Sequence, residues 1–204
     1  MHALWTVAEI VAATGGRPEG VSDGPLGSIS IDSREIAAEA LFVAIKGDSQ
    51  DGHDYVQKAL DAGASAALVS EAWAINHHPD RLIVVPDTLE ALRALARAAR
   101  TRSRAVLVAV TGSAGKTTTK EAIRTVLQAA GDTHYSIKSF NNHWGVPLML
   151  ARMPREAQYG VFEIGMNHAG EIAPLVQMVR PHIAVITTVA AAHLEFFSSV
   201  TAIA

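Results

Sequence analysis

The stretch from residue 105 to residue 131 constrains the fold more than any other part of the sequence. It begins with the apolar run AVLVAV, continues into the loop TGSAGKTTTK and leads into the helical pattern EAIRTVLQAAG. An apolar strand that runs through a glycine-containing loop into a helix is the basic unit of a parallel α/β sheet. The sequence therefore predicts an α/β fold for this part of the chain.

The loop in this unit has the features of a phosphate-binding loop, although the pattern G-x-x-x-x-G-K-[ST] needs a glycine where Val110 stands. Gly112 and Gly115 allow the backbone to curl so that its N–H groups point inward. Lys116 can reach the β- and γ-phosphates, and Thr117 can offer its hydroxyl to Mg²⁺. The alternative, a tight turn with an incidental lysine, explains fewer of these features. The sequence predicts a nucleoside triphosphate site.

Two domains are expected, over residues 1–86 and 87–204. The first begins with a helix whose capping box is Thr6 and Glu9, followed by the short β-rich runs SISID, LFVAI, AALVS and RLIVVP. A helix that starts after Asp87 leads into the second domain, where strands and helices alternate. We therefore expect a small α/β domain followed by a mostly parallel sheet that carries the phosphate loop.

Polar residues follow the apolar strands of the second domain and mark candidate site positions. Glu163 ends the strand YGVFEIG, where a carboxylate is costly unless it is paired or bound to a metal; the alternative is an edge residue that faces solvent. Asn141 and Asn142 lie in a loop that should reach the same edge of the sheet, although paired asparagines also serve turns. Alone, His193 reads as an ordinary loop or core residue, and Glu171 as a cap for the next helix.

Composition argues against several other classes of protein. The 204 residues contain no cysteine and carry a net charge of −3, so disulfides, thiolate metal sites and nucleic-acid binding are not expected. No apolar run approaches the roughly 20 residues of a membrane span, and the N-terminus lacks a signal-peptide pattern, so a cytoplasmic location is the default. The arginines at positions 97, 100, 102 and 104 are expected to form a solvated helix end.

These features together resemble the Mur ligases, ATP-dependent enzymes that form amide bonds in peptidoglycan precursor synthesis. The family's loop is T-G-[ST]-x-G-K-T-[TS], which lacks the same first glycine. The resemblance implies a metal site with Mg²⁺ held by Thr117, Glu163 and His193, and a catalytic role for Lys116, Glu163 and His193. It implies that ATP is contacted by the loop and by the asparagine pair: Thr111, Gly112, Ser113, Ala114, Gly115, Lys116, Thr117, Thr118, Asn141 and Asn142.

The first domain is similar to the family's N-terminal module, which binds the UDP part of a UDP-muramoyl-peptide. The stretch DSREIAAEALFVAIKGDSQDGHDYVQKALDAGASAALV carries this similarity, although IAAEA stands where the family usually has Pro-Gly. The departure is expected to alter a turn alone. The residues that the resemblance places near the nucleotide-sugar are Ser33, Arg34, Lys46, Asp51, Gly52 and His53.

Within the family, the segments DGHDY, FNNHWGVPL and EIGMNHAGEI most resemble the members that join D-alanyl-D-alanine to UDP-N-acetylmuramoyl-tripeptide through an acyl phosphate. Three alternatives remain open at this point. They are a relative that adds the third amino acid, a folylpolyglutamate synthase-like ligase and a non-catalytic nucleotide-binding module.

The family's carbamylated lysine follows the His-Leu-Glu segment, whereas the last lysine here is Lys138. We therefore expect a fragment of a ligase that has no ligase activity by itself. A central sheet that stops early should expose apolar surface and an unpaired strand edge. Self-association through that edge is a further expectation.

Overall fold

The structure is a computed structural model that describes residues 3–47, 49–77, 79–191 and 199–203. It divides into two compact units, residues 1–95 and 96–204. The division lies between Leu95 and Ala96, inside the helix that we expected to begin the second domain, and the expected boundary at residue 87 stays a prediction. None of the helices in the described ranges has both the length and the apolar character needed to cross a membrane.

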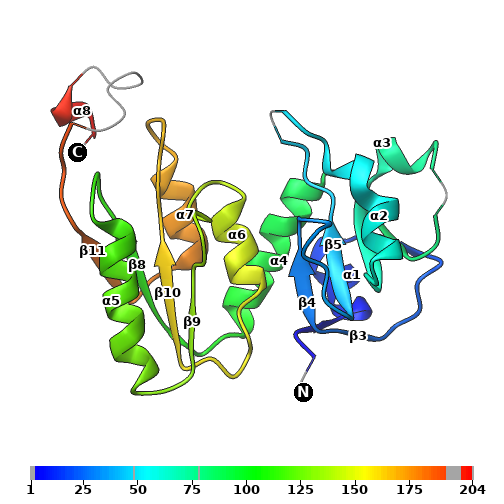
Figure 1. The fold of residues 1–204 in the computed structure, drawn as a ribbon, viewed down its shortest axis with the longest axis horizontal. Coiled ribbons are helices and arrows are strands. Elements are labelled where there is room, and N and C mark those ends of the chain that lie inside the picture. The colour runs from blue at the N-terminus through cyan, green and yellow to red at the C-terminus, as the bar shows by residue number, and fades with distance from the viewer. Residues whose placement is uncertain (1–2, 48, 78, 192–198, 204) are drawn as a thin grey trace. The chain divides into compact units, whose positions relative to one another are not determined.

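The first unit is built around a five-stranded sheet in the order β2-β7-β6-β5-β4 (Figure 1). β2 is antiparallel to β7, and the other neighbours are parallel. A separate antiparallel pair is formed by β1 and β3. The elements are β1 (Trp5–Thr6), α1 (Val7–Thr14), β2 (Arg17–Glu19), β3 (Pro25–Leu26), β4 (Ser28–Ser30), β5 (Ala40–Val43), the 3₁₀ helix η1 (Gly52–Tyr55), α2 (Val56–Asp61), β6 (Ala66–Ser70), α3 (Glu71–Ala74) and β7 (Leu82–Val85).

Local sequence accounts for the ends of the helices in this unit. Thr6 and Glu9 form the predicted capping box at the start of α1, and Gly15 ends that helix in the left-handed conformation. The helix expected over DGHDYVQKALDAGA is instead a 3₁₀ turn, η1, followed by the shorter α2. Asp51 caps the start of η1, where its carboxylate accepts the His53 N–H at 3.0 Å.

The second unit contains a four-stranded, fully parallel sheet in the order β11-β8-β10-β9, which confirms the predicted parallel architecture. The strand that carries the phosphate loop, β8, lies between two others, so its carboxyl end is flanked on both sides. The elements are α4 (Thr88–Arg102, which spans the division), β8 (Val106–Thr111), α5 (Lys116–Gln128), β9 (Thr133–Tyr135), α6 (Gly145–Ala151), β10 (Tyr159–Glu163), α7 (Ile172–Val179), β11 (Ile183–Ile186) and α8 (Val200–Ile203).

The sheet of the second unit has helices on both faces. On one face, Leu107, Ala109 and Phe162 pack with buried residues of α6 and α7. On the other face, Val108, Val110 and Val161 pack against the α5 residues at positions 123 and 127. Burial on both faces explains why these strands read as continuous apolar runs rather than as alternating patterns.

Arg97 and Arg104 are exposed, as expected of a solvated helix end, whereas Arg100 near the end of α4 is partly buried. The guanidinium of Arg100 donates to the backbone oxygens of Val179 at 2.8 Å and of Arg180 at 3.0 Å. These carbonyls end α7, so Arg100 satisfies acceptors that a helix C-terminus leaves open. Partial burial, with the nearby charge of Arg180, lowers the pKa of Arg100.

The strand β11 carries the apolar surface that we expected at an edge of the sheet. It pairs with β8, and within the described ranges no strand pairs with its other side. Its residues Ile183 and Ile186 are 52% and 67% exposed. Self-association through this edge stays a prediction.

His134 on β9 gives the second unit a pH-dependent stability. Burial lowers the pKa of His134 to about 4, against the opposing effect of its hydrogen bond to Met149 O at 2.7 Å. Because the unfolded chain takes up the proton near pH 6.5, the folded state loses stability as the pH falls from about 6.5 to about 4. We expect a loss of roughly 3 kcal/mol over this range.

Urea unfolding of the wild type and of His134→Gln at pH 7, 5.5 and 4 measures this effect. Glutamine keeps a donor for the Met149 carbonyl but does not titrate, so the variant should lose clearly less stability at low pH. Parallel curves for the two proteins would show that His134 is not responsible.

Candidate nucleotide-binding site

The polar residues predicted at the strand ends lie at one edge of the parallel sheet. In the strand register, Glu163 pairs with Val110 and Ile186 pairs with Thr111. The ends of β10 and β11 therefore flank the phosphate loop that follows β8. Ligand sites in open parallel sheets form at this carboxyl edge.

The loop from Thr111 to Lys116 has the geometry of an anion site. Gly112 and Gly115 adopt φ angles of 133° and 80°, which other residues rarely reach. Gly115 is the N-cap of α5 and provides no side-chain cap, so the first N–H groups of the helix point into the loop without a side-chain acceptor. The Lys116 ammonium folds back and donates to Gly112 O at 2.7 Å. This part of the sheet edge can hold phosphates.

Residues 187–190, which follow β11, are hydrogen-bonded to the phosphate loop. We call this segment the clasp. Ser113 N–H donates to Thr188 O at 2.8 Å, and Ser113 Oγ exchanges two hydrogen bonds with the Ala190 backbone at 3.0 and 3.1 Å. Thr187 Oγ1 lies 2.6 Å from Ala114 O. Sequence reasoning missed this contact because it joins positions more than 70 residues apart.

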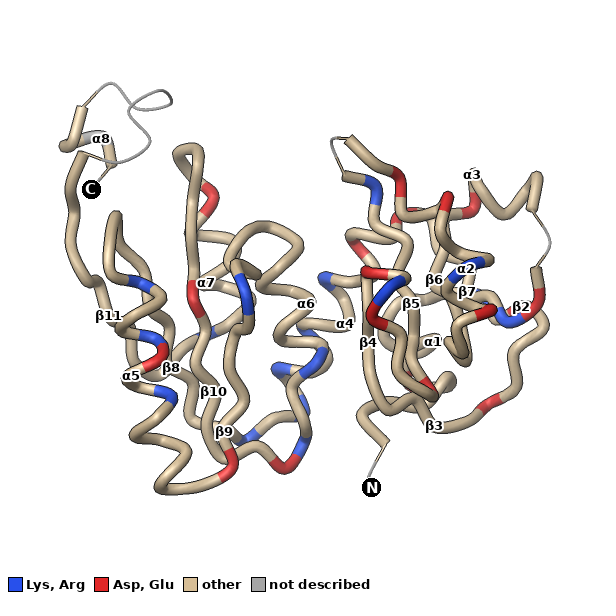
Figure 2. Tube along the Cα trace, in the orientation of Figure 1, with Lys and Arg blue, Asp and Glu red and all other residues tan. Residues whose placement is uncertain are grey.

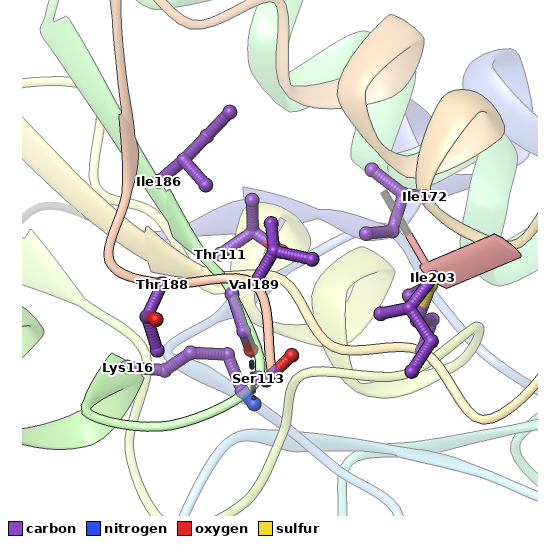
Figure 3. A pocket seen from close by; sticks show the side chains of 10 residues that line it. Thr111, Ser113, Lys116, Ile172, Ile186, Thr188, Val189 and Ile203 are labelled. Atoms are coloured by element: carbon purple, nitrogen blue, oxygen red, sulfur yellow. Dashed lines mark hydrogen bonds between the residues drawn. The ribbon is translucent and has the colours of Figure 1, made fainter. Parts of the chain in front are cut away.

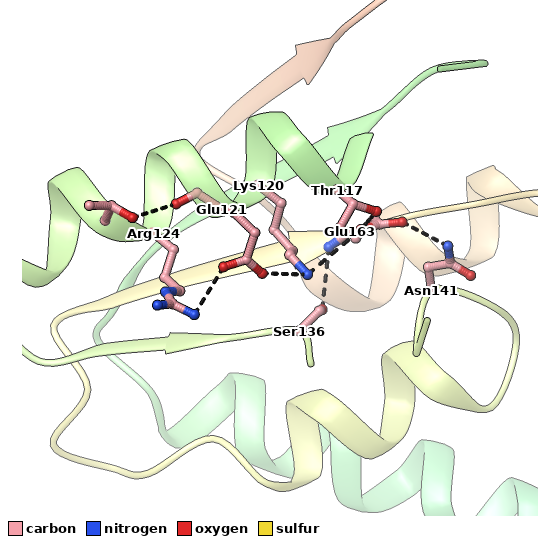
Figure 4. Close-up of polar contacts among 8 residues, drawn as sticks. Thr117, Lys120, Glu121, Arg124, Ser136, Asn141 and Glu163 are labelled. Carbon is pink, nitrogen blue, oxygen red and sulfur yellow. Dashed lines mark hydrogen bonds and ion pairs between the residues drawn. The ribbon is translucent and has the colours of Figure 1, made fainter. Parts of the chain in front are cut away.

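Glu163 is buried at 3% exposure beneath the start of α5. Its Oε2 accepts a hydrogen bond from Thr117 Oγ1 at 2.9 Å, and its Oε1 accepts one from Asn141 Nδ2 at 2.9 Å (Figure 4). The solvent-facing edge residue considered as an alternative is thereby excluded. Gly165 lies close beside this contact, and a Cβ there would come within 3.0 Å of the Asn141 amide.

The Thr117–Glu163 pair suits Mg²⁺. Both groups offer oxygen atoms, which are the ligands that Mg²⁺ prefers, so these residues would hold it. The observed separation of these two oxygens is 2.9 Å. Within the described ranges no group of three His, Asp or Glu residues could hold a metal by itself. The predicted third ligand, His193, lies outside the described residues.

A row of charged side chains on α5 ends beside Glu163. Lys120 Nζ lies 3.8 Å from Glu163 Oε2 and 3.0 Å from Glu121 Oε1, and Arg124 pairs with Glu121 at 2.9 Å. Figure 2 shows the basic and acidic residues close together along this helix. Sequence reasoning did not assign Lys120, although its spacing of one helical turn from Lys116 could have suggested it.

Two predicted polar residues serve local structure. Asn142 Oδ1 accepts the Gly145 N–H at 2.8 Å and so fixes the start of α6, while its neighbour reaches Glu163. We expected Glu171 to cap α7 with its side chain, but it makes no side-chain capping hydrogen bond to that helix. Its carboxylate instead accepts the N–H groups of Asn167 and His168, and these hydrogen bonds lower the pKa of Glu171.

A cavity of about 200 Å³ adjoins the phosphate loop (Figure 3). Ser113 and Lys116 provide polar groups, and the remaining wall is mainly apolar, with Ile172, Ile186 and Val189. The cavity leaves room beside the Lys116 ammonium for part of a bound molecule.

The residues predicted to contact a nucleotide-sugar follow neighbouring parallel strands of the first unit. Ser33 and Arg34 come after β4, and the loop that starts at Lys46 comes after β5. The Arg34 guanidinium is largely exposed and makes a two-pronged contact with Asp32 at 2.9 and 2.7 Å. Because parallel strands end at one edge, these residues share the edge where such sheets bind ligands.

The loop after β5 is held by its own residues. Lys46 and Asp51 form a backbone bridge, and a side chain at Gly52 would lie 2.7 Å from the Ile45 backbone. His53 Nε2 accepts the Ser70 N–H at 3.0 Å, so its Nδ1 carries the proton that it donates to Asp51 Oδ1 at 2.6 Å. Both ring nitrogens of His53 are therefore engaged in holding the loop.

The fold and the loop define the second unit as a nucleotide-binding domain with a phosphate loop. Comparison with known proteins gives the family. Residues 26–100 match the Mur ligase family, catalytic domain, and residues 110–204 match the Mur ligase middle domain. The chain belongs to the Mur ligase family.

Two curated relatives share one name. The UDP-N-acetylmuramoyl-tripeptide--D-alanyl-D-alanine ligase of Rickettsia prowazekii is 44% identical over 176 residues, which cover 86% of this chain and 39% of the relative. The ligase of the same name from Escherichia coli is 39% identical over 199 residues, covering 98% of this chain and 43% of the relative. The chain thus spans about two fifths of the length of these relatives.

Solved structures agree with this result. MurF from Acinetobacter baumannii superposes with a TM-score of 0.85 at 33% identity, over 98% of this chain and 44% of that chain. The MurF ligase from Thermotoga maritima, solved in complex with ADP, gives a TM-score of 0.73 at 32% identity, over 86% of this chain and 40% of that chain.

Proposed function

We propose that this chain is the UDP-substrate-binding and ATP-binding part of a ligase that adds D-alanyl-D-alanine to UDP-N-acetylmuramoyl-tripeptide. The observation that carries the proposal is the buried Glu163 carboxylate, held by Thr117 at the first turn after the phosphate loop. Its setting in a Mur ligase chain, with relatives named for this reaction, supplies the substrates.

The reaction consists of a phosphoryl transfer followed by an acyl transfer. An oxygen of the tripeptide's terminal carboxylate attacks the γ-phosphorus of ATP, the bond to the β–γ bridging oxygen breaks, and ADP leaves. The dipeptide amine then attacks the carbonyl carbon of the acyl phosphate, loses a proton and expels phosphate. Positioning and charge neutralisation supply most of the catalysis in such a sequence.

The residues of this chain serve the first of these steps. Lys116 and the N–H groups at the start of α5 hold the phosphates, and the clasp sets the path of the loop around them. Thr117 and Glu163 would hold Mg²⁺, which neutralises phosphate charge when bound. Metal ligation by His193 and the ATP contacts of Thr118, Asn141 and Asn142 are part of this proposal.

The first unit supplies the UDP-muramoyl site in this proposal. Ser33, Arg34 and the loop around Asp51 lie at the carboxyl edge of the sheet. The exposed Arg34 guanidinium pairs with Asp32 through Nε and Nη2, and a diphosphate would pair with it in place of, or beside, that carboxylate. Asp51 and His53 support the loop rather than reach outward, since their hydrogen bonds point at each other and at Ser70.

Calorimetric titration of UDP-N-acetylmuramoyl-tripeptide into this chain, with UDP-glucose as the comparison ligand, tests the substrate. We expect the muramoyl-tripeptide to bind selectively. Arg34→Ala should weaken that binding roughly tenfold because it removes the positive charge that pairs with the diphosphate. Arg17→Ala is the matched control, since Arg17 is also exposed and pairs with a carboxylate two residues away, Glu19.

Three results would count against this part of the proposal. Equal binding of the two ligands would show that the muramoyl-peptide is not recognised. Binding of a folate in place of either ligand would favour the folylpolyglutamate synthase-like alternative. Nucleotide binding with no UDP-sugar binding would favour the non-catalytic module.

A further inference from the structure

Lys120 is a buried lysine at 1% exposure, on the helix that leaves the phosphate loop. A lysine is rarely buried without a partner, because removing its charge from water is costly. Its ammonium has two carboxylates within reach, Glu121 at 3.0 Å and Glu163 at 3.8 Å. It therefore lies between an exposed anion and the buried anion of the proposed metal site.

The contact with Glu163 is one of charge rather than of hydrogen bonding. At 3.8 Å the Lys120 ammonium is beyond hydrogen-bond distance of Oε2. Both oxygens of Glu163 already accept hydrogen bonds, one from Thr117 and one from Asn141. Lys120 therefore contributes a positive charge close to a carboxylate that is already satisfied in its hydrogen bonds.

Glu121 is the nearer of the two carboxylates that face this ammonium. Its side chain is 42% exposed, holds Lys120 at hydrogen-bond distance and is itself held by Arg124 at 2.9 Å (Figure 4). The flexible stem of a lysine allows its charge to shift between such partners at small cost. A cation that arrives at Glu163 would find Lys120 already drawn toward Glu121.

We propose that Lys120 is a positioning residue that balances the charge of Glu163 while no divalent cation is bound, and that the Lys120–Glu121 pair thereby sets the affinity of the site for Mg²⁺. This inference rests on the metal site of the proposed function. Lys120 and Mg²⁺ compete for one carboxylate, so weakening either contact of Lys120 should change magnesium affinity in a defined direction.

The test is a ratio of two ADP dissociation constants measured by calorimetry: the constant in EDTA divided by the constant in excess Mg²⁺. A larger ratio means that Mg²⁺ tightens ADP binding more. Lys120→Met removes the competing charge at similar volume and should raise the ratio roughly tenfold over the wild type. Glu121→Gln releases Lys120 toward Glu163 and should lower the ratio roughly threefold. Lys120→Arg keeps the positive charge, so its ratio should stay near the wild-type value.

The ratio separates this role from a purely structural one. A structural defect in the loop would weaken ADP binding in EDTA and in Mg²⁺ alike, which leaves the ratio unchanged. Unchanged ratios in Lys120→Met and Glu121→Gln would overturn the inference, as would a lower ratio in Lys120→Met. Should Lys120→Met not fold, the exposed Glu121→Gln decides alone. A wild-type ratio of one would instead contradict the metal site of the proposed function, and the inference with it.

Discussion

Replacing Lys116 with alanine is expected to weaken ADP binding by roughly 100-fold, because loss of one partner from a desolvated charge pair costs about 2–5 kcal/mol. The Lys116 ammonium lies over the loop, 2.7 Å from Gly112 O, and lines the adjoining cavity. No backbone N–H can replace a positive charge at this position. In an enzyme form that turns over, the same change should abolish Mg-ATP consumption.

Calorimetry with ADP and Mg²⁺ measures this effect, and Lys58→Ala provides the matched control. Lys58 is an exposed lysine on α2 in the other unit, so its removal changes the net charge equally without touching the loop. Near-normal ADP affinity in Lys116→Ala would contradict the assignment of the loop as a phosphate site.

Replacing Gly112 with alanine is expected to destabilise the second unit by roughly 2–4 kcal/mol and to remove ADP binding. The added Cβ would lie 2.2 Å from Thr187 Oγ1 and 2.9 Å from Thr188 O, at a φ of 133°. Rotation of Thr187 relieves the first clash only by giving up its contact with Ala114 O at 2.6 Å. The substitution therefore strains the loop and opens the clasp together.

Thermal unfolding and ADP titration of this variant should be compared with Gly170→Ala. Gly170 also has a positive φ, 86°, but a Cβ there meets nothing within 4 Å. It should lose only the backbone preference, about 1 kcal/mol, and keep its nucleotide affinity. Equal behaviour of the two variants would mean that the clasp does not matter for the loop.

The fold could be predicted where local pattern and tertiary burial agree. Strands buried on both faces gave continuous apolar runs, and the capping box of Thr6 and Glu9 marked the first helix. The antiparallel β2 was missed because its residues, Arg17–Glu19, are polar, include a proline and lie at the edge of the sheet. Such a segment has no apolar pattern from which a strand could be inferred.

The site could be predicted in its loop and its carboxylate, but not in the contacts that support them. Glu163 stood out as a charge in an apolar strand, and Asn141 followed from the edge rule for parallel sheets. The two hydrogen bonds of Arg100 to the end of α7 join residues 79 and 80 positions apart, and side-chain contacts of the clasp join residues 73 and 77 positions apart. No local pattern encodes contacts of this range, since each partner looks like an ordinary surface residue in sequence.

The proposed metal site is tested most directly by ADP binding to the wild-type chain with Mg²⁺ and with EDTA, repeated with Glu163→Gln. We expect Mg²⁺ to tighten ADP binding in the wild type, and we expect the amide at position 163 to remove this gain while binding in EDTA is preserved. ADP binding that is equally tight with and without Mg²⁺ in the wild type would contradict the claim that Thr117 and Glu163 form the metal side of a nucleotide site.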